Sequence, residues 1–459
     1  MELHMIRVSL FISSSKKYIK KGFAVLSPFL FLLLLFGANR LLRYLIYDDS
    51  DSYTRLAFHE MRTQQENIDV LFLGSSHCFR SVDVGVTDEL FAANTFNAGS
   101  ALQSWDGSYA ILKEAAKKND LKKVYVEMYY DIAGEVYWER EGLTSVYIIS
   151  DYLSPSFNKA RYLMEGSAPD YWIEGFFSPR RYWQKLFSRG HIAEVVATKR
   201  TEGYKNYEYW GDPETDSQYY TQKGYIANRE SIENYDFSFE GDWEPIPDAV
   251  FSADDKKSVK RIIDYCEKHD IELAFFSVPM PYYNMVATGN YESYIEQVNN
   301  LLEESGVPYY DFNLCREEYF SYDCGLFMDE DHLNSAGAES FSQLFAELML
   351  GQIEKEDLFY DSYEEKMQSI ADRVYGVTYS VTETEADKCF TFETVQKGNV
   401  DCYASIYRMV SGTEDYEELR VLAPLDHISV PAGEQGKLRI DIFADAQGRE
   451  LTNQIYIDY

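Results

Sequence analysis

Short, mostly apolar runs recur along the middle of the chain, with amphipathic stretches of helical spacing between them. An apolar run that is too short for a helix and has no helical period is typical of a buried strand. Between two of these runs, Ser252 and Asp255 resemble a capping box, and Val259, Ile262 and Cys266 follow at helical spacing. The five runs occupy residues 69–73, 95–100, 123–128, 271–278 and 307–312. This alternation predicts an α/β domain with a parallel sheet and right-handed crossovers, which we place at residues 66–352.

The regular pattern is interrupted between about residues 133 and 250, where aromatic residues crowd without a clear period. We interpret this stretch as a large, partly helical insertion that forms a cap over the carboxyl edge of the sheet. Its aromatic faces could bind sugar rings, or they could simply pack the cap together, and the sequence leaves both open. Arg180 and Arg181 are a candidate anion contact, although surface arginines usually have no such role.

Towards the C-terminus the pattern changes from helices to strands. Residues 353–376 are acidic and predict a helical linker. Beyond them, short strands are separated by turn signals, and residues 438–442 alternate strictly between apolar and polar, as a half-buried antiparallel strand does. We therefore predict a small all-β accessory domain, similar to a β-sandwich, over residues 377–459.

The N-terminus has a membrane-anchor pattern. An uncharged apolar run from Gly22 to Asn39 follows a cluster of four lysines, and Arg40 and Arg43 can extend their charges outwards. The pattern predicts a basic cytoplasmic segment (1–21), a transmembrane helix (22–47) and a stem (48–65). The positive-inside rule then makes this a single-pass protein of the cell membrane with its catalytic and β domains outside the cytoplasm. A cleaved signal peptide is the alternative.

Composition narrows the classes of partner and cofactor. The chain has 459 residues, enough for two domains and accessory segments. Its formal net charge of −33 argues against nucleic acid or anionic lipid as a partner for the bulk of the chain. Six cysteines include no pair at Cys-x-x-Cys spacing, so no zinc site is indicated, and we expect no metal and no cofactor.

Two polar stretches at the ends of predicted elements carry the candidate chemistry. Gly74-Ser75-Ser76-His77 follows the first strand, where the glycine permits a sharp turn and the serines reach the carboxyl edge of the sheet. About 250 residues later, Asp329 and His332 stand three residues apart, just ahead of the last helix of the domain. Such a pair can supply a general base and the carboxylate that orients it.

Together with Gly99 after the second strand, these residues resemble the SGNH/GDSL hydrolase superfamily over residues 66–350, excluding most of the insertion. Within it the chain is most similar to membrane-anchored, extracytoplasmic relatives: the teichoic-acid D-alanylation protein and the polysaccharide O-acetylation proteins. The resemblance implies a three-layer α/β domain in which Ser76 is the nucleophile, His332 its base and Asp329 the orienting acid. It also implies an oxyanion hole made by the backbone N–H groups of Ser76 and Gly99.

The chain departs from the family at its third conserved block, which usually supplies an asparagine as a further oxyanion donor. Here the corresponding strand ends at Glu127, and an ionised carboxylate cannot donate a hydrogen bond. Either the hole has two donors or another residue supplies the third, for which His77 is a candidate. We count His77, Asn97 and Glu127 as candidate substrate or oxyanion supports, although for His77 we prefer the interpretation of a turn-stabilising hydrogen-bond partner over a catalytic group.

These features lead to a ranked set of functions. The first is acyl transfer, through an acyl-serine, onto an envelope polysaccharide (O-acetylation) or teichoic acid (D-alanylation). The family resemblance implies a multi-spanning membrane O-acyltransferase as the partner that delivers the acyl group. A carbohydrate esterase with the same triad is the second. The alternative from another class is a non-catalytic surface protein that binds glycan.

Overall fold

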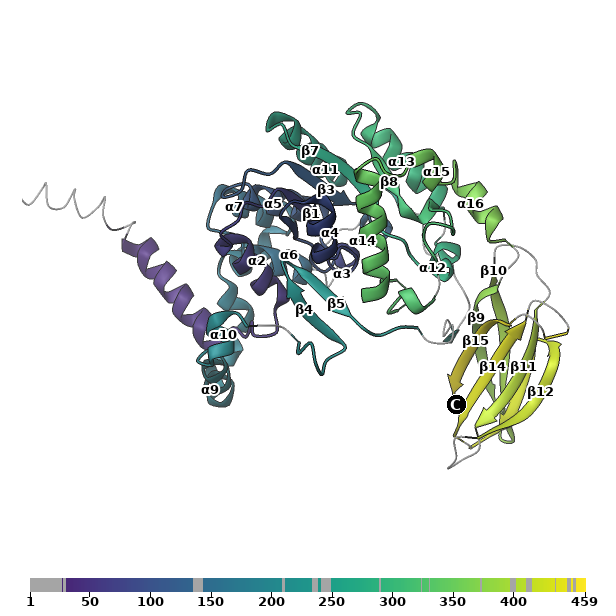
Figure 1. Ribbon diagram of the computed structural model, residues 1–459. Helices are drawn as coiled ribbons and strands as arrows, with labels where there is room; N and C mark the ends of the chain where they lie inside the picture. Colours follow the sequence, from purple (N-terminus) through teal and green to yellow (C-terminus); the bar gives the residue numbers. More distant parts are fainter. Residues whose placement is uncertain are drawn as a thin grey trace, which may run out of the picture. The chain divides into compact units, whose positions relative to one another are not determined.

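The computed structural model describes residues 27, 30–134, 143–208, 211–232, 238–240, 249–288, 290–322, 324–329, 331–371, 374–396, 402–409, 415–433, 435–443, 447–448 and 451–459 (Figure 1). The chain divides into two compact units. The small unit comprises Met1–Ser52 and Ser167–Glu208, and the large unit comprises Tyr53–Gly166 and Tyr209–Tyr459.

A parallel sheet of five strands forms the centre of the large unit, in the order β2-β1-β3-β7-β8. All five predicted strands form, so the prediction of an α/β fold with a parallel sheet is confirmed. Their bounds are β1 (Val70–Leu73), β2 (Thr95–Asn97), β3 (Lys123–Glu127), β7 (Glu272–Ser277) and β8 (Tyr309–Asp311).

The strand order fixes where the helices lie. From β1 the chain moves to β2, which lies on one side of β1. It then returns past β1 and adds β3, β7 and β8 in turn on the other side. Right-handed crossovers therefore place α4 (Val84–Phe91) on one face and α5 (Trp105–Ala115), α11 (Ala253–Lys268) and α13 (Tyr291–Glu303) on the other. In agreement, α5 packs against α11, and α14 (Ser335–Met349) packs against α4. The direction reverses at β1, and such sheets bind ligands at the carboxyl ends of the strands around that point.

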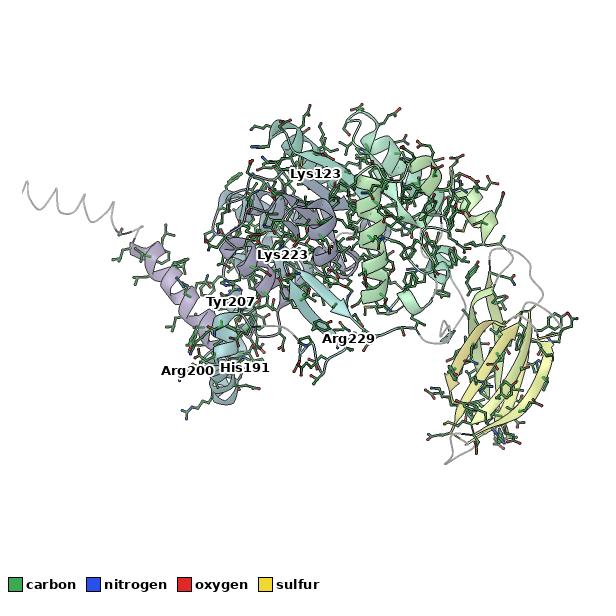
Figure 2. All side chains as sticks on the ribbon, viewed as in Figure 1. Lys123, His191, Arg200, Tyr207, Lys223 and Arg229 are labelled. Carbon is green, nitrogen blue, oxygen red and sulfur yellow. The ribbon has the colours of Figure 1, made fainter. Side chains whose placement is uncertain are left out.

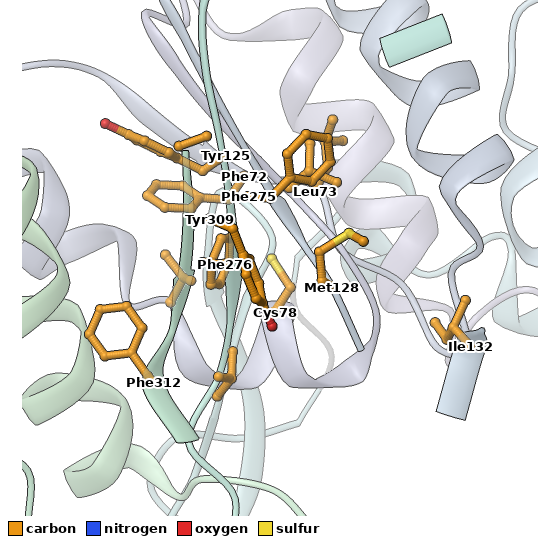
Figure 3. Close-up of a cluster of buried hydrophobic side chains, with 14 of the residues drawn as sticks. Phe72, Leu73, Cys78, Tyr125, Met128, Ile132, Phe275, Phe276, Tyr309 and Phe312 are labelled. Carbon is orange, nitrogen blue, oxygen red and sulfur yellow. The ribbon is translucent and has the colours of Figure 1, made fainter. Parts of the chain in front are cut away.

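Aromatic side chains fill the space between the sheet and α14. The ring of Phe72 on β1 lies 5.2 Å from that of Tyr125 on β3, and Phe345 meets both rings edge-on at 5.7 and 5.0 Å. Phe276 on β7 continues the cluster towards Phe312 (Figure 3). Each such side chain, when fully buried, stabilises the fold by roughly 1.5–3 kcal/mol. This rigid core supports the strand ends that carry the site.

The predicted insertion does not form a single cap. Its helices α6 (Leu143–Ser150) and α7 (Phe157–Glu165) are part of the large unit, where Ile149, Tyr162 and Leu163 join the core. Residues 167–208 belong to the small unit instead. Residues 135–142, 209–210, 233–237 and 241–248 of the predicted insertion lie outside the described residues.

A hairpin from the same insertion forms a separate two-stranded sheet, and its turn contacts the edge strand β2. Its strands are β4 (Gln218–Gln222) and β5 (Tyr225–Asn228), and at its turn the Lys223 carbonyl oxygen accepts a hydrogen bond of 2.9 Å from the Asn97 N–H. Gly224 in that turn has φ +87°, and a Cβ there would lie 1.7 Å from the Asn97 carbonyl oxygen. Glycine is therefore required for the hairpin to approach β2.

The small unit joins a helical N-terminal segment to short helices of the insertion. Residues 30–46 are helical, and with them are η2 (Pro169–Tyr171), α8 (Trp172–Phe176), η3 (Ser178–Phe187), α9 (Arg189–Thr198) and α10 (Glu202–Asn206) (Figure 1). Of the predicted basic segment and anchor, residues 1–26, 28 and 29 lie outside the described part. Among the residues that the structure describes, no helix has both the length and the apolar character needed to cross a bilayer. The predicted transmembrane helix is therefore not supported by the structure.

Two predicted connectors are packed against the large unit. The predicted stem contains α2 (Tyr53–Thr63), whose Leu56, Phe58 and Met61 are buried. The predicted linker contains α15 (Lys355–Leu358) and α16 (Tyr363–Ser369), with Leu358 and Lys366 fully buried. A sequence that is polar overall thus still forms short helices that are partly buried in the large unit.

The C-terminal region is antiparallel, as predicted, and consists of two four-stranded sheets in the orders β13-β10-β9-β6 and β12-β11-β14-β15. Their strands are β9 (Val374–Glu383), β10 (Asp387–Gln396), β11 (Tyr403–Met409), β12 (Tyr416–Pro424), β13 (His427–Pro431), β14 (Lys437–Phe443) and β15 (Leu451–Asp458). One strand was not predicted: β6 (Ser238–Glu240) comes from the insertion and pairs in parallel with β9.

Candidate active site

The turn after β1 is held from several sides. Gly74 ends the strand, and a Cβ there would lie 2.3 Å from Glu127 Oε2 and 2.7 Å from Cys78 Cβ. Ser75 caps α3 (Ser76–Ser81), because its side chain accepts a hydrogen bond from the His77 N–H. The Ser75 N–H donates in turn to Glu127 Oε2 at 2.5 Å. These contacts fix Ser76 as the first residue of α3, half-buried at the carboxyl end of the central strand.

Ser76, His332 and Asp329 form a continuous hydrogen-bonded chain. Ser76 Oγ lies 2.8 Å from His332 Nε2, and His332 Nδ1 lies 3.0 and 3.1 Å from the two carboxylate oxygens of Asp329. Burial raises the pKa of the Asp329 carboxyl, but the hydrogen bond and charge of His332 outweigh this effect and hold the pKa below its usual value. Asp329 is therefore ionised and favours the tautomer that leaves Nε2 as acceptor for the serine proton.

Contacts made by neighbouring residues fix the loop that carries His332. Asp329 Oδ1 also accepts the His332 N–H at 2.7 Å, which closes the three-residue spacing into a turn. Asn334 caps α14 by accepting from the Gly337 N–H, and a Cβ on Gly337 would lie 2.2 Å from the Leu326 carbonyl oxygen. The cap and the glycine hold the loop against the helix, so His332 is positioned by backbone contacts.

His77 forms a second, buried charged group beside this chain. Its Nε2 lies 3.0 Å from Asp331 Oδ1, and its ring stacks on that of His332 with centroids 4.5 Å apart. Asp331 also accepts from Tyr129 Oη at 2.8 Å and from Asn284 Nδ2 at 2.8 Å. Burial alone lowers the pKa of His77, but the charge and hydrogen bond of Asp331 and the charge of Glu127 raise it to about 9. His77 is thus an imidazolium at neutral pH.

The two predicted oxyanion donors differ in their contacts. The Ser76 N–H has no hydrogen-bond partner among the described residues, which leaves it available at the start of α3. The Gly99 N–H, the second predicted donor, donates to Asn97 Oδ1 at 3.2 Å, so it has a protein partner in this structure. A Cβ on Gly99 would lie 3.0 Å from both the Ser75 carbonyl oxygen and the Phe79 nitrogen, so this glycine allows the loop to pack against the nucleophile turn.

Each of the three predicted substrate or oxyanion supports contacts other groups of the protein. Asn97 Nδ2 donates to the carbonyl oxygens of Cys78 and Val82 at 2.8 and 3.0 Å, which ties α3 to β2. Glu127 holds the Ser75 N–H, and burial raises the pKa of its carboxyl. His77 directs Nδ1 towards Ser75 Oγ at 3.3 Å and Nε2 towards Asp331, so both ring nitrogens face protein groups. His77 belongs to the turn that presents Ser76, whereas Asn97 and Glu127 contact that turn and α3 from the ends of β2 and β3.

One cluster of the described residues has the geometry of a metal site. Ligand atoms of His77, Asp331 and His332 lie within 4.8 Å of one another. However, the Nε2 of His332 is hydrogen-bonded to Ser76 Oγ, and a protonated His77 has no lone pair to offer a metal. This donor set fits proton transfer better than metal binding.

The sequence analysis did not single out Tyr129, Asn284 or Asp331, the residues that form the surroundings of His77. Tyr129 follows β3 and Asn284 lies in α12 (Tyr282–Ala287) soon after β7, so both sit beyond carboxyl ends of strands. The rule that ligands bind at those ends would have marked both stretches. No pattern in the sequence indicates that all three surround one histidine.

Comparisons with known proteins give only remote similarity. No family model matches the chain, and no curated protein matches it. A solved structure from Streptococcus pneumonia, named for platelet activating factor, is 10% identical with a TM-score of 0.31, covering 67% of this chain and 96% of that one. A gut microbial diltiazem-metabolizing enzyme is 12% identical (TM-score 0.18; 81% and 71% covered). Beta-glucosidase 3B from Thermotoga neapolitana is 12% identical (TM-score 0.13; 86% and 75% covered). The functional argument therefore rests on the geometry of the site.

Proposed function

We propose that this protein is a serine-dependent acyl-transfer enzyme of the SGNH type, with Ser76 as nucleophile, His332 as general base and Asp329 as orienting acid. The observation that carries the proposal is the hydrogen-bonded chain from Ser76 Oγ through His332 to the carboxylate of Asp329. A nucleophile within hydrogen-bond reach of a base that is itself oriented by a carboxylate is the arrangement that activates a serine hydroxyl.

In the first half-reaction, Ser76 Oγ attacks the carbonyl carbon of an ester while His332 Nε2 takes its proton. The negative charge on the carbonyl oxygen is stabilised by the Ser76 N–H at the start of α3. When the tetrahedral intermediate collapses, the bond to the leaving alcohol breaks and His332 returns the proton to that oxygen. The acyl group is then an ester of Ser76.

In the second half-reaction an acceptor hydroxyl replaces the leaving alcohol. His332 Nε2 removes the proton of the acceptor, whose oxygen attacks the acyl carbon, and Ser76 Oγ leaves with that proton. Water as acceptor gives hydrolysis, and a sugar or polyol hydroxyl gives transfer. The same residues serve both outcomes, so the acceptor site decides between an esterase and a transferase.

For the acceptor we propose a hydroxyl of a cell-envelope polysaccharide or of teichoic acid, outside the cytoplasm. The motif resemblance to envelope acyltransferases and the absent asparagine block support this choice over a general secreted esterase. A multi-spanning membrane O-acyltransferase would supply the acyl group, and attachment of both proteins to one membrane would raise their effective concentration. A carbohydrate esterase with water as acceptor is the second candidate.

The test is covalent labelling of the purified full chain by an active-site fluorophosphonate, measured by intact mass. We expect one phosphonyl adduct per chain, and none on Ser76→Ala. Ser340→Ala is the matched control, because Ser340 is an exposed serine on α14, and it should label like the wild type. Labelling that survives in Ser76→Ala, or wild-type protein that does not label, would count against Ser76 as nucleophile and favour the non-catalytic glycan-binding alternative.

A further inference from the structure

Exposed apolar side chains gather on two consecutive elements of the small unit. On α8 and η3, Ile173 is 59% exposed, Trp183 55% and Phe187 80%. The two elements pack against each other, and the rings of Trp183 and Phe187 lie 6.1 Å apart, edge to face. We call the exposed side chains of residues 171–189 the aromatic–basic face. Isolated exposed apolar residues are ordinary, but a contiguous group marks an interaction surface.

The charge of this face is opposite to that of the chain. Residues 171–189 contain four basic residues and one acidic residue, whereas the whole protein carries a net charge of −33. Arg180, Lys185 and Arg189 are exposed. A surface that combines Trp, Phe and Leu with Lys and Arg is the composition of segments that lie in the interface of an anionic bilayer.

The N-terminal helix extends the apolar surface of the same unit. Every residue from Leu30 to Phe36 is apolar and between 44% and 70% exposed. Seven consecutive apolar residues cover all sides of a helix, and a helix that is apolar all round is normally buried in protein or in lipid. The described residues leave it uncovered, and its lack of polar groups makes it unsuited to a glycan.

Direct contacts join this helix to the segment that carries the aromatic–basic face. His191 Nε2 lies 2.9 Å from the Ile46 carbonyl oxygen, and Arg43 Nη1 lies 3.5 Å from Ser178 Oγ. The rings of Tyr47 and Tyr182 lie 5.2 Å apart. In Figure 2, His191 and Arg200 lie beside the end of the N-terminal helix. The apolar helix and the face therefore belong to one folded unit.

We propose that the aromatic–basic face lies in the headgroup layer of an anionic lipid bilayer, beside the N-terminal apolar helix. Trp183 and Phe187 then enter the boundary between headgroups and acyl chains, and Arg180, Lys185 and Arg189 contact lipid phosphates. This inference concerns a surface that the proposed reaction does not use, and it explains why residues 171–189 expose aromatic side chains.

The test uses the full chain reconstituted into vesicles that contain phosphatidylglycerol and lipids brominated near the headgroup end of the acyl chains. Brominated lipid should quench the tryptophan fluorescence, and Trp183→Phe should lose most of that quenching. Trp105→Phe is the matched control, because Trp105 is 2% exposed in the core of the large unit, and it should leave the quenching unchanged. Equal quenching in Trp183→Phe and wild type would overturn the proposal.

A second arm tests the basic residues. Quenching of Trp183 should be reduced in the triple variant Arg180→Glu, Lys185→Glu, Arg189→Glu. It should also be reduced for the wild type in vesicles of phosphatidylcholine alone. Phe157→Ser, which changes a side chain 83% exposed on α7 of the large unit, should not. Identical quenching under all these conditions would contradict the charge complementarity. Fluorophosphonate labelling of Ser76 in each variant shows that the fold is kept, so failure of this inference and failure of the proposed function are distinguishable.

Discussion

Gly74 illustrates how a single missing side chain positions the nucleophile. A methyl group there would meet Glu127 Oε2 at 2.3 Å and Glu127 Cβ at 2.5 Å. We expect Gly74→Ala to destabilise the protein by about 1–3 kcal/mol, the usual cost of overpacking, and to reduce labelling of Ser76 because the turn must shift. Urea denaturation and the labelling rate measure the two effects.

Gly190→Ala is the matched control for this substitution. Gly190 lies in α9, and a Cβ there would meet nothing within 4 Å. Alanine is the better helix former, so the variant should be as stable as the wild type or slightly more stable. Equal effects of the two substitutions would show that close packing at Gly74 is not what holds the turn.

His77 makes the stability of the fold depend on pH. Its pKa is raised to about 9 in the folded protein from the ordinary 6.5. A group with a raised pKa stabilises the fold fully below pH 6.5 and loses that contribution as the pH rises through about 9. The urea concentration at the midpoint of unfolding should therefore decrease as the pH rises over this range. In Asp331→Asn this decrease should be smaller. His427→Gln, which changes an exposed histidine on β13, should keep the wild-type dependence of the urea midpoint on pH. The same dependence in Asp331→Asn would contradict the assignment of this effect to His77.

Individual residues of the site were predictable to different degrees. Ser76, Asp329 and His332 could be singled out because their motifs include the residues that force the local turns, such as Gly74 and Asn334. The Gly99 donor was not predictable in the same way, since whether its N–H is free depends on the Asn97 side chain. Hydrogen bonds of buried side chains depend on packing between segments, which the sequence does not display.

At the scale of elements, the β4–β5 hairpin connects the insertion to the site. Its turn contacts β2, and Gln218 Oε1 on β4 accepts from Arg80 Nη2 of α3 at 3.0 Å. Gly224→Ala should displace the turn, because a Cβ would overlap the Asn97 carbonyl oxygen and φ is +87°. We expect a loss of at least about 1 kcal/mol in stability and slower labelling of Ser76. An unchanged labelling rate in a destabilised variant would show that the hairpin does not position α3.

The elements also show where sequence patterns are sufficient. The five central strands are apolar runs bounded by turn residues, so each can be predicted from its own residues and those next to it. β6 has only three residues and is defined by its pairing with β9, more than a hundred positions later. The segments around α2 and α16 were predicted to be polar connectors because their buried residues include polar and charged side chains, such as Thr54 and Arg55 of α2 and Lys366 of α16.

At the scale of the whole molecule, the net charge of −33 opposes the compact state through self-repulsion. Salt screens exposed charges, with a Debye length of about 10 Å at 0.1 M. The urea midpoint should therefore rise as sodium chloride is added up to about 0.5 M, where the Debye length is only a few ångströms. A midpoint that is flat or falls over this range would show that local ion pairs outweigh the net repulsion.

The division of the chain into two units was not evident from the sequence. The predicted insertion was contiguous, yet residues 143–166 pack into the large unit while residues 167–208 join the N-terminal helix. The reason is that the partner of residues 167–208 lies more than a hundred positions earlier, so only the folded chain shows the association. The fold class could be predicted because it depends on local periodicity.

The central claim is that Ser76 carries the acyl group, and acid-quenched peptide mapping tests it most directly. The full chain is mixed with p-nitrophenyl acetate, quenched within the first turnovers and digested. We predict that Ser76 is acetylated as p-nitrophenol is released and that the acetyl group is then lost as acetate forms. Ser76→Ala should give no acetylated peptide. Release of p-nitrophenol with the acetyl group on another residue, or with none on Ser76, would contradict the account.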